Sequence, residues 1–345
     1  MTASRSDAAP ILALVSSALL CAGCLSFQRG AMPGEPADAT FATVRGARVR
    51  YVVEGEGSPV VLLHGYASSL ETWDTVRPAL RERHRVVSLD LKGFGWTDRP
   101  PGDYSPEEQA RLVLALMDEL HIERAALVGH SYGASVALAV ALAAPDRVSR
   151  LALYDAWVYE DQLPSFFHWA RADGLGEVLF GAFYDQRPDE RLERAFYDPD
   201  AVSEELVEAV ERAMERPGTR AAALATARGM RYARLEGRYG TVEQPVLLLW
   251  GREDAVTPVE VGERLLRELP NAAMQVFPRC GHFPMIEASR ASARVLGEFL
   301  AEDVVAVAEP TPPVVAPRSV ADDAPDAAAD PSSPWPGDLE TGEAP

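Results

Sequence analysis

Features that indicate a cofactor or a nucleic-acid partner are missing from this 345-residue sequence. It has no glycine-rich loop of the type that holds nucleotide phosphates, and no histidine and carboxylate cluster at metal-binding spacing. We therefore expect no cofactor and no metal. Basic residues are also scarce, with 33 lysines and arginines against 52 acidic residues. The net charge of −19 argues against nucleic acid as a partner.

Cysteine is rare, and two of the three cysteines lie near the N-terminus. Residues 11–22 form an uncharged apolar run that is shorter than the roughly 20 residues a membrane span needs. This run resembles the core of a secretory signal, so we predict a signal peptide of the lipoprotein type over residues 1–23. The segment Leu20-Cys21-Ala22-Gly23-Cys24 then resembles a bacterial lipobox, although Cys21 stands where leucine is usual.

The lipobox resemblance implies that Cys24 is acylated and becomes the mature N-terminus. We therefore expect an exported protein, anchored to a membrane by lipid and facing the periplasm or the cell exterior. An uncleaved anchor, or plain secretion after a nearby small residue, remains an alternative. Cys280 would then be the only free thiol, which excludes an intramolecular disulfide, and we expect it to be a small buried filler.

Composition divides the rest of the chain into three parts. Residues 24–40 are predicted to be a short tether, and residues 41–303 a single catalytic domain with a helical cap at about 157–243. Residues 304–345 are rich in proline, alanine and aspartate and offer little apolar surface to offset the entropy of ordering. We predict that this acidic tail is disordered.

The pentapeptide Gly-His-Ser-Tyr-Gly at residues 129–133 is the first sign of chemistry. An apolar run precedes it at residues 125–128, and an alanine-rich and leucine-rich segment follows at 134–144. Strand, sharp turn and buried helix form the setting in which such a motif acts as a nucleophile elbow. The sequence therefore predicts that Ser131 is a nucleophile.

A serine nucleophile needs a base, and His282 is the best placed of the six histidines. It follows a strand-like segment at residues 274–277 and precedes a final amphipathic helix, so its loop can reach the sheet edge. His130 adjoins the serine, but we expect its ring to point away from the hydroxyl. His84 and His121 lie at the ends of predicted helices and are expected to be solvated.

The acid that orients the base is predicted to be Asp254, on the loop after a buried strand at residues 246–250. The chain order is then serine, acid, histidine. Asp155 follows another strand, at residues 151–154, and remains an alternative acid. Glu253 is expected to be solvated.

Two backbone N–H groups should stabilise an oxyanion. One is the amide of Tyr132, directly after the nucleophile. The other is the amide of Tyr66, which follows the apolar strand at residues 60–63 and the dipeptide His64-Gly65.

These motifs together resemble the α/β-hydrolase superfamily, in the branch of serine hydrolases that carries a helical cap. The resemblance covers residues 49–300 and rests on five segments in order: 63–66, 90–95, 129–133, 251–254 and 281–282. Related epoxide hydrolases and haloalkane dehalogenases use an aspartate nucleophile, which Ser131 argues against. Trp96-Thr97 departs from the small, serine-containing continuation that is usual in the family, so the substrate shape is expected to differ there.

Hydrophobic patterning independently predicts an α/β fold. Residues 48–54 alternate like a half-buried strand, while short apolar runs suit strands buried on both faces of a parallel sheet, at 60–63, 86–89, 126–128, 151–154 and 246–250. Helical patterns separate them, at 70–83, 106–120, 259–269 and 288–300. The alternation predicts a mostly parallel, doubly wound sheet of about eight strands.

The alternation stops in the predicted cap, where residues 203–214 have a helical pattern. The first half of this region is rich in aromatic residues, namely Trp157, Tyr159, Phe166, Phe167, Trp169, Phe180, Phe183 and Tyr184. Packing of the cap onto the core accounts for them, and so does an apolar pocket for an acyl or aryl group. Both interpretations remain open.

The predicted function is a serine hydrolase that cleaves a carboxylic ester of a small to medium apolar substrate through an acyl-enzyme. The same triad also suits a C–C bond hydrolase, a lactonase, an amidase or a cofactor-free haloperoxidase. A catalytically silent, membrane-tethered binding protein is the alternative of another class.

Overall fold

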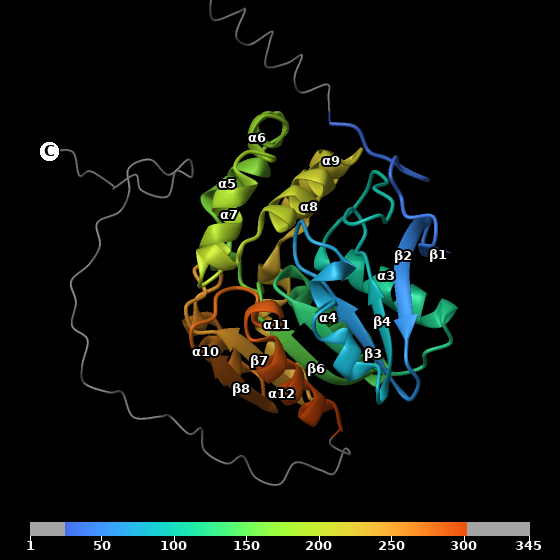
Figure 1. Cartoon of the computed structure of the whole chain (residues 1–345), viewed down its shortest axis with the longest axis vertical. Coiled ribbons are helices and arrows are strands. Elements are labelled where there is room, and N and C mark those ends of the chain that lie inside the picture. The colour runs from blue at the N-terminus through green and yellow to red at the C-terminus, as the bar shows by residue number, and fades with distance from the viewer. Residues whose placement is uncertain (1–24, 302–345) are drawn as a thin grey trace, which may run out of the picture.

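The computed structural model describes residues 25–301, and within them one eight-stranded sheet organises the fold (Figure 1). Its strand order is β1-β2-β4-β3-β5-β6-β7-β8. The pairs β1–β2 and β2–β4 are antiparallel and all other pairs are parallel, which confirms the predicted mostly parallel α/β-hydrolase fold. The strands are β1 (Thr40–Val44), β2 (Ala47–Glu54), β3 (Ser58–Leu63), β4 (His84–Leu89), β5 (Ala125–His130), β6 (Val148–Tyr154), β7 (Val246–Gly251) and β8 (Ala272–Phe277).

Helices cover both faces of this sheet because its central strands are apolar on both sides. Alternate residues of β3 enter different cores: Val61 and Leu63 face one, whereas Val60 and Leu62 face the other. The first core is closed by α3 (Pro106–Glu119), α4 (Tyr132–Ala143) and α10 (Val259–Glu268). The second is closed by α2 (Arg77–Leu80), α11 (Pro284–Glu287) and α12 (Ser289–Ala301).

Two elements differ from the sequence predictions. The helix expected over residues 70–83 is broken into a 3₁₀ helix, Leu70–Trp73, and the single turn of α2. Pro78 has no amide to bond the carbonyl of Asp74, so one continuous helix is interrupted there. The strand β1, which the sequence patterning did not single out, pairs with β2 at the sheet edge.

The N-terminal strap, residues 25–32, lies against the body of the protein. Gln28 and Arg99 exchange two backbone hydrogen bonds of 2.9 and 2.8 Å, and the amide of Gly30 donates to Asp98 Oδ1 at 2.8 Å. Within the predicted tether, residues 28–30 are therefore hydrogen-bonded to Asp98 and Arg99. The predicted signal peptide, Cys24 and the acidic tail lie outside the described residues.

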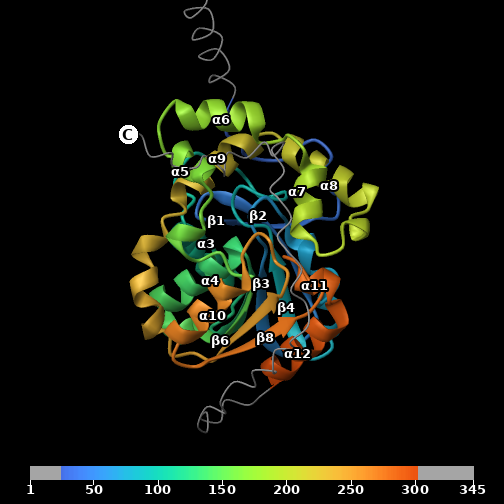
Figure 2. The same ribbon diagram turned by 90° about the vertical axis from the view of Figure 1, so that its left-hand side faces the viewer.

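Five helices between β6 and β7 form the cap (Figure 2). They are α5 (Ser165–Ala170), α6 (Leu175–Phe183), α7 (Pro188–Ala195), α8 (Glu204–Glu215) and α9 (Thr219–Gly229). The Ser203 hydroxyl accepts a hydrogen bond from the Leu206 amide and so begins α8, close to the helix expected at 203–214. Among residues 25–301, no helix has the length and apolar character needed to cross a membrane.

Candidate active site

Ser131 lies in a sharp turn between β5 and α4. Its backbone has a φ of 51°, a left-handed conformation that is strained for serine. The flanking glycines make the turn possible, because a Cβ on Gly133 would lie 2.2 Å from the Leu63 carbonyl oxygen. A Cβ on Gly129 would lie 2.5 Å from the Gly133 carbonyl oxygen. Neither position has room for a side chain, so the sequence fits the geometry of a nucleophile elbow.

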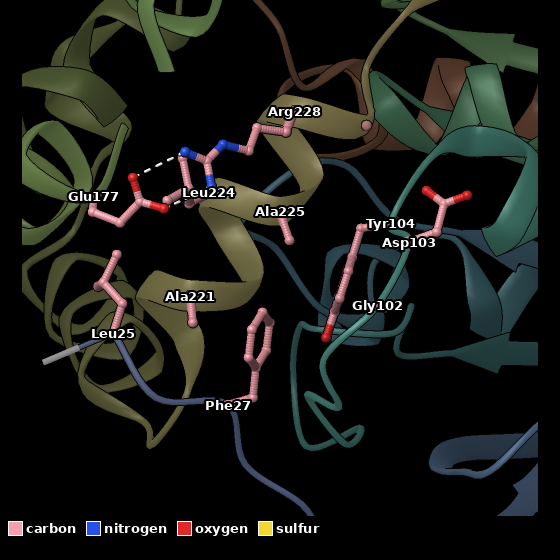
Figure 3. A pocket seen from close by; sticks show the side chains of 11 residues that line it. Leu25, Phe27, Gly102, Asp103, Tyr104, Glu177, Ala221, Leu224, Ala225 and Arg228 are labelled. Atoms are coloured by element: carbon pink, nitrogen blue, oxygen red, sulfur yellow. Dashed lines mark hydrogen bonds and ion pairs between the residues drawn. The ribbon is translucent and has the colours of Figure 1, made fainter. Parts of the chain in front are cut away.

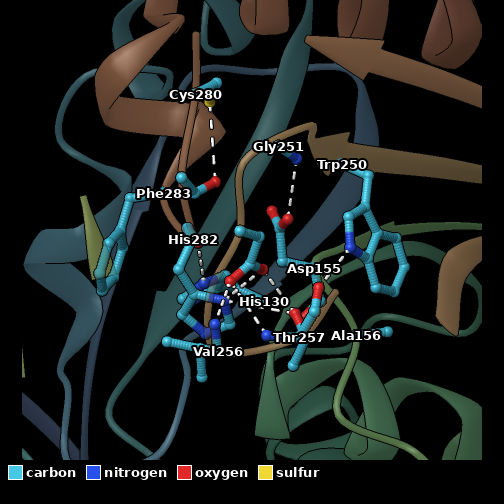
Figure 4. Close-up of polar contacts among 12 residues, drawn as sticks. His130, Asp155, Ala156, Trp250, Gly251, Val256, Thr257, Cys280, His282 and Phe283 are labelled. Carbon is cyan, nitrogen blue, oxygen red and sulfur yellow. Dashed lines mark hydrogen bonds and ion pairs between the residues drawn. The ribbon is translucent and has the colours of Figure 1, made fainter. Parts of the chain in front are cut away.

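His282 and Asp254 meet in a buried hydrogen bond, in which His282 Nδ1 lies 2.7 Å from Asp254 Oδ2. Figure 4 shows His282 and Thr257 within this cluster of polar contacts. The carboxylate also accepts from three groups of its own loop. The amides of Val256 and Thr257 donate to Oδ1 at 2.7 and 2.9 Å, and the Thr257 hydroxyl donates to Oδ2 at 2.6 Å. The carboxylate is therefore held in one orientation toward the imidazole.

These contacts fix the charge of Asp254 and the tautomer of His282. Burial acts to raise the pKa of Asp254, but His282 and the Thr257 donors outweigh it and hold the pKa below its usual range. An ionised carboxylate only accepts hydrogen bonds, so the proton between the two residues belongs to His282 Nδ1. Nε2 is then left as the nitrogen that can take a proton.

Asp155, the alternative acid, has a different partner. Its Oδ1 accepts a hydrogen bond from the Gly251 amide at 2.9 Å, whereas the His282 ring bonds Asp254. Burial, followed by the charge of Asp254, raises the pKa of Asp155 well above its usual range. Burial therefore favours the protonated form of Asp155, beside the carboxylate of Asp254.

Polar atoms of Asp155, Asp254 and His282 all lie within 4.8 Å of one another, a spacing that would also suit a metal ion. The surrounding donors favour a different interpretation. Asp254 already accepts hydrogen bonds from the imidazole, a hydroxyl and two amides, and burial disfavours a charge on Asp155. This chemistry fits a hydrogen-bonded triad better than a cation site.

His130 holds the loop that carries His282. Its Nε2 lies 2.8 Å from the His282 carbonyl oxygen, and the two rings are 4.8 Å apart between centroids. Burial, and then the neighbouring His282, lowers the pKa of His130 well below its usual value, so the ring is neutral and Nε2 donates. His130 therefore ties the turn of Ser131 to the loop of His282.

His64 orients the peptide bond between Gly65 and Tyr66. The Leu91 amide donates to His64 Nε2 at 3.0 Å, so the ring proton lies on Nδ1, which donates to the Gly65 carbonyl at 2.7 Å. In a trans peptide, carbonyl and N–H point in opposite directions, so the Tyr66 amide points away from this ring. The Gly65 backbone borders the nucleophile, since a Cβ there would lie 3.2 Å from Ser131 Cβ.

Tyr132, the other predicted oxyanion donor, is the first residue of α4. Its amide is one of the first four in the helix, which have no acceptor within the helix. The side chain points into the core, where its hydroxyl donates to the Tyr104 carbonyl at 2.7 Å. Only the backbone of Tyr132 is therefore available to the site.

Close backbone packing brings the loop after β8 to the end of β7. A Cβ on Gly251 would lie 1.9 Å from the Gly281 carbonyl oxygen, so this contact requires glycine. The exposed Glu253 accepts a hydrogen bond from the Cys280 amide at 3.0 Å. Cys280 itself is fully buried and burial raises its pKa, which fits the inert filler expected from the sequence.

The cap contacts the site through its aromatic residues and through α7. The Tyr66 and Phe167 rings are 5.5 Å apart, and Trp157 lies 5.4 Å from Phe167, each edge to face. The Ala195 carbonyl at the end of α7 accepts a hydrogen bond from the His282 amide at 2.7 Å. The aromatic residues thus pack the cap together. Trp157 also lies beside the nucleophile, because its amide donates to the Ser131 carbonyl at 3.1 Å, and we call Tyr66, Trp157 and Phe167 the aromatic roof.

Trp96 and Thr97 are the residues at which the sequence departs from the family pattern, and Trp96 contacts the cap. The Arg216 guanidinium lies 3.7 Å from the centre of the Trp96 ring, at the end of α8. The Thr97 hydroxyl donates to the Asp90 carbonyl and accepts from the Arg50 amide, at 2.8 and 2.9 Å. Thr97 is therefore structural, whereas Trp96 is a contact between the core and the cap.

Two residues that contribute to the site did not stand out in the sequence. Thr257 was only a neighbour of Asp254, although a threonine three residues after an aspartate is a common partner for local side-chain hydrogen bonds. His130 was expected to point away from the serine hydroxyl, and no local signal indicated that it would bond the distant carbonyl of His282.

The sequence of this chain is similar to a known protein family and to individual hydrolases. The family described as alpha/beta hydrolase fold matches residues 58–289. The chain is 33% identical over 261 residues to a 2-hydroxy-6-oxo-2,4-heptadienoate hydrolase of Pseudomonas putida, covering 72% of this chain and 91% of the relative. It is 31% identical over 271 residues to a 2-hydroxymuconate semialdehyde hydrolase of a Pseudomonas species, covering 74% and 92%.

Two solved structures show the same arrangement. A meta-cleavage product hydrolase from Pseudomonas fluorescens IP01 has 29% sequence identity and a TM-score of 0.67, covering 76% of this chain and 97% of its own. A thermophilic esterase from Thermogutta terrifontis has 26% identity and a TM-score of 0.67, covering 76% and 98%.

Proposed function

Because this chain belongs to the α/β-hydrolase family, we propose that it hydrolyses a bond at a carbonyl carbon with Ser131 as nucleophile. The observation that carries the proposal is the buried bond of His282 to Asp254, at the same sheet edge as the strained turn of Ser131. A base, an acid that orients it and a nucleophile thus come from loops after three strands, β8, β7 and β5.

In the proposed mechanism, Ser131 Oγ attacks the carbonyl carbon while His282 Nε2 takes the hydroxyl proton. Asp254 stabilises the resulting imidazolium. His282 returns the proton to the leaving group as its bond to the carbonyl carbon breaks, which leaves an acyl-enzyme. Water, deprotonated by His282, then attacks the acyl carbon. His282 returns that proton to Ser131 Oγ as the bond from Oγ to the acyl carbon breaks, which releases the carboxylic acid.

The negative oxygen of the tetrahedral intermediate is proposed to lie between the amides of Tyr66 and Tyr132. The hydrogen bond from His64 to the Gly65 carbonyl supports this role, because it fixes the direction of the Tyr66 N–H. His64 acts here as a positioning residue, and burial lowers its pKa so that it stays neutral.

The substrate class we favour is a carboxylic ester with an apolar acyl group. Support comes from the aromatic roof of Tyr66, Trp157 and Phe167, which offers apolar surface beside the nucleophile. Hydrolysis of p-nitrophenyl esters from short to long acyl chains tests this class. Turnover that requires Ser131 supports the proposal, and no turnover of any ester by a folded protein contradicts it.

A second candidate is C–C bond hydrolysis of an unsaturated oxo acid, because relatives are named as hydrolases of a 2-hydroxy-6-oxo-dienoate and of a meta-cleavage product. Such substrates carry a carboxylate, which favours a nearby cation. Arg191 in α7 donates to the carbonyls of Tyr184 and Phe183 at 2.7 and 2.9 Å, and its charge interacts with Tyr66. Burial lowers its pKa, yet arginine remains protonated at neutral pH.

Arg191→Gln separates the two substrate classes. A 2-hydroxy-6-oxo-dienoate should lose kcat/KM in this variant, while a neutral p-nitrophenyl ester should keep it. No turnover of the dienoate by the unaltered protein would exclude this second candidate.

We also propose that the protein is exported and lipid-anchored at Cys24. Cys24→Ser should change its membrane partitioning and its electrophoretic mobility, and failure to change either contradicts this assignment. A catalytically silent binding protein would instead bind the membrane normally and turn over no substrate.

A further inference from the structure

The outward face of α6 is apolar, which is unusual for a surface helix. Positions i, i+3, i+4 and i+7 of the helix are Leu175, Val178, Leu179 and Ala182, and all four are exposed or partly exposed. Leu175 and Phe183 keep 46% and 49% of their surfaces exposed. Leu179 packs against the buried core, whereas Leu175, Ala182 and Phe183 are exposed. A helix on the outside of a globular protein normally presents polar side chains to solvent, so these exposed apolar side chains mark a surface of interest.

Neighbouring segments also expose apolar side chains. Helix α5, which packs against α6, exposes Trp169. The N-terminal strap contributes Leu25 and Phe27, which line a surface cavity of about 610 Å³ together with residues of α6 and α9 (Figure 3). We call Leu25, Phe27, Trp169, Leu175 and Phe183 the cap patch.

The border of the cavity carries one arginine and three acidic side chains. Glu177 of α6 and Arg228 of α9 form an ion pair of 2.8 Å beside the cavity. The exposed Asp103 also lines this cavity, and the exposed Asp173 lies 3.6 Å from Arg228, so the border carries more negative than positive charge. The exposed apolar side chains themselves are uncharged, so a strongly anionic partner is not favoured. An uncharged apolar surface suits a lipid interface better.

The N-terminal strap places the start of the described chain close to the cap. Gln28 is fixed to Arg99 by two backbone hydrogen bonds, and Cys24 lies only four residues before it. Even a fully extended chain spans at most about 3.6 Å per residue, so Cys24 lies within about 14 Å of Gln28. Residues 1–24 contain the apolar run 11–22. A membrane anchor in this segment would therefore hold the cap close to the membrane.

We propose that the cap patch docks on the surface of a lipid bilayer, so that the cap of the hydrolase faces the membrane. This inference rests on the proposed membrane anchor, but on neither the triad nor the substrate. Exposed tryptophan and phenylalanine side chains suit the interface between lipid headgroups and acyl chains. The orientation gives substrates dissolved in the bilayer the shortest route to the cap.

Quenching of tryptophan fluorescence by brominated phosphatidylcholine tests the docking on the full chain in vesicles. Of the described tryptophans, Trp169 is the exposed one, since Trp73, Trp96, Trp157 and Trp250 are buried. Brominated vesicles should quench the emission relative to plain vesicles, and Trp169→Phe should remove most of that quenching. Trp335→Phe, in the tail, is the matched control and should leave it unchanged.

A double variant separates docking from anchoring. Leu175→Asp with Phe183→Asp should abolish most of the quenching while flotation with vesicles and hydrolysis of a water-soluble ester stay unchanged. Leu175→Met with Phe183→Leu keeps the patch apolar and should retain the quenching.

Three results would overturn the docking. In the first, the protein floats with vesicles but Trp169 is not quenched. In the second, the aspartate variant is quenched as strongly as the unaltered chain. In the third, sedimentation shows a dimer that the aspartate variant abolishes without any quenching, which assigns the patch to a second copy. Flotation and quenching need no turnover, so a failed hydrolase assignment leaves this test intact.

Discussion

The ring of His130 donates a hydrogen bond of 2.8 Å to the carbonyl oxygen of His282, 152 residues further along the chain. This bond joins the residue before the proposed nucleophile to the proposed base. The relative position of the two groups therefore depends on a neutral histidine that takes no part in the proton transfers.

His130→Phe keeps an aromatic ring but removes this donor. A displacement of about 1 Å between reacting groups can cost on the order of 100-fold in rate, so we expect kcat to fall by about 10- to 100-fold. Steady-state kinetics on a p-nitrophenyl ester measures the change. His121→Asn, at an exposed position with a φ of 55°, is the control and should keep full activity. An unchanged kcat in His130→Phe would remove the positioning role.

Asp254→Asn and Asp155→Asn distinguish the two buried acids. Loss of the triad carboxylate should lower kcat by about 10⁴-fold, since the imidazole loses its tautomer control. Burial favours the protonated form of Asp155, and asparagine can still accept from the Gly251 amide, so Asp155→Asn should keep activity within about 10-fold. A larger fall in kcat in Asp155→Asn than in Asp254→Asn would show that Asp155 is the acid of the triad.

Asp155 also predicts a pH dependence of stability. Its folded-state pKa is raised, so between the unfolded value of about 3.9 and the folded value the native state binds more protons. The free energy of unfolding therefore falls as pH rises through that window. Asp155→Asn should flatten this decline in urea unfolding measured from pH 4 upward, and an unaltered slope would contradict a buried neutral acid.

Thr257 is expected to hold the Asp254 carboxylate through its hydroxyl. Thr257→Val removes a donor to a charged group, which contributes about 1.5–3 kcal/mol to the free energy of unfolding. Thr257→Ser keeps the hydroxyl and should retain most of that stability. Denaturant unfolding and kcat of both variants test the contribution, and equal effects of valine and serine would argue against it.

Gly251 allows the loop of His282 to reach the end of β7. Gly251→Ala places a Cβ against the Gly281 carbonyl oxygen, so we expect a loss of about 1–3 kcal/mol in stability, with reduced kcat. Gly297 in α12 has open space around it, and Gly297→Ala should stabilise the helix by up to about 1 kcal/mol. Similar unfolding midpoints for both variants would contradict the close approach.

The sequence predicted the fold well because buried parallel strands are short apolar runs, as β5 and β7 are. Each predicted member of the site directly follows a strand, where ligands and reacting groups gather in such sheets. Hydrophobic patterning failed where a single residue determines whether a helix continues, as when Pro78 breaks the helix expected at 70–83. It also failed for contacts between distant segments, such as Gln28 with Arg99 and His130 with His282, which no local period encodes.

The central claim is that Ser131 is the nucleophile, and covalent labelling tests it most directly. The full chain is treated with a fluorophosphonate, digested, and the modified residue is located by mass spectrometry. We predict a single phosphonate adduct on Ser131, absent in Ser131→Ala and strongly slowed in His282→Ala. No adduct on Ser131 in a folded protein, or an adduct formed equally fast without His282, would contradict the account.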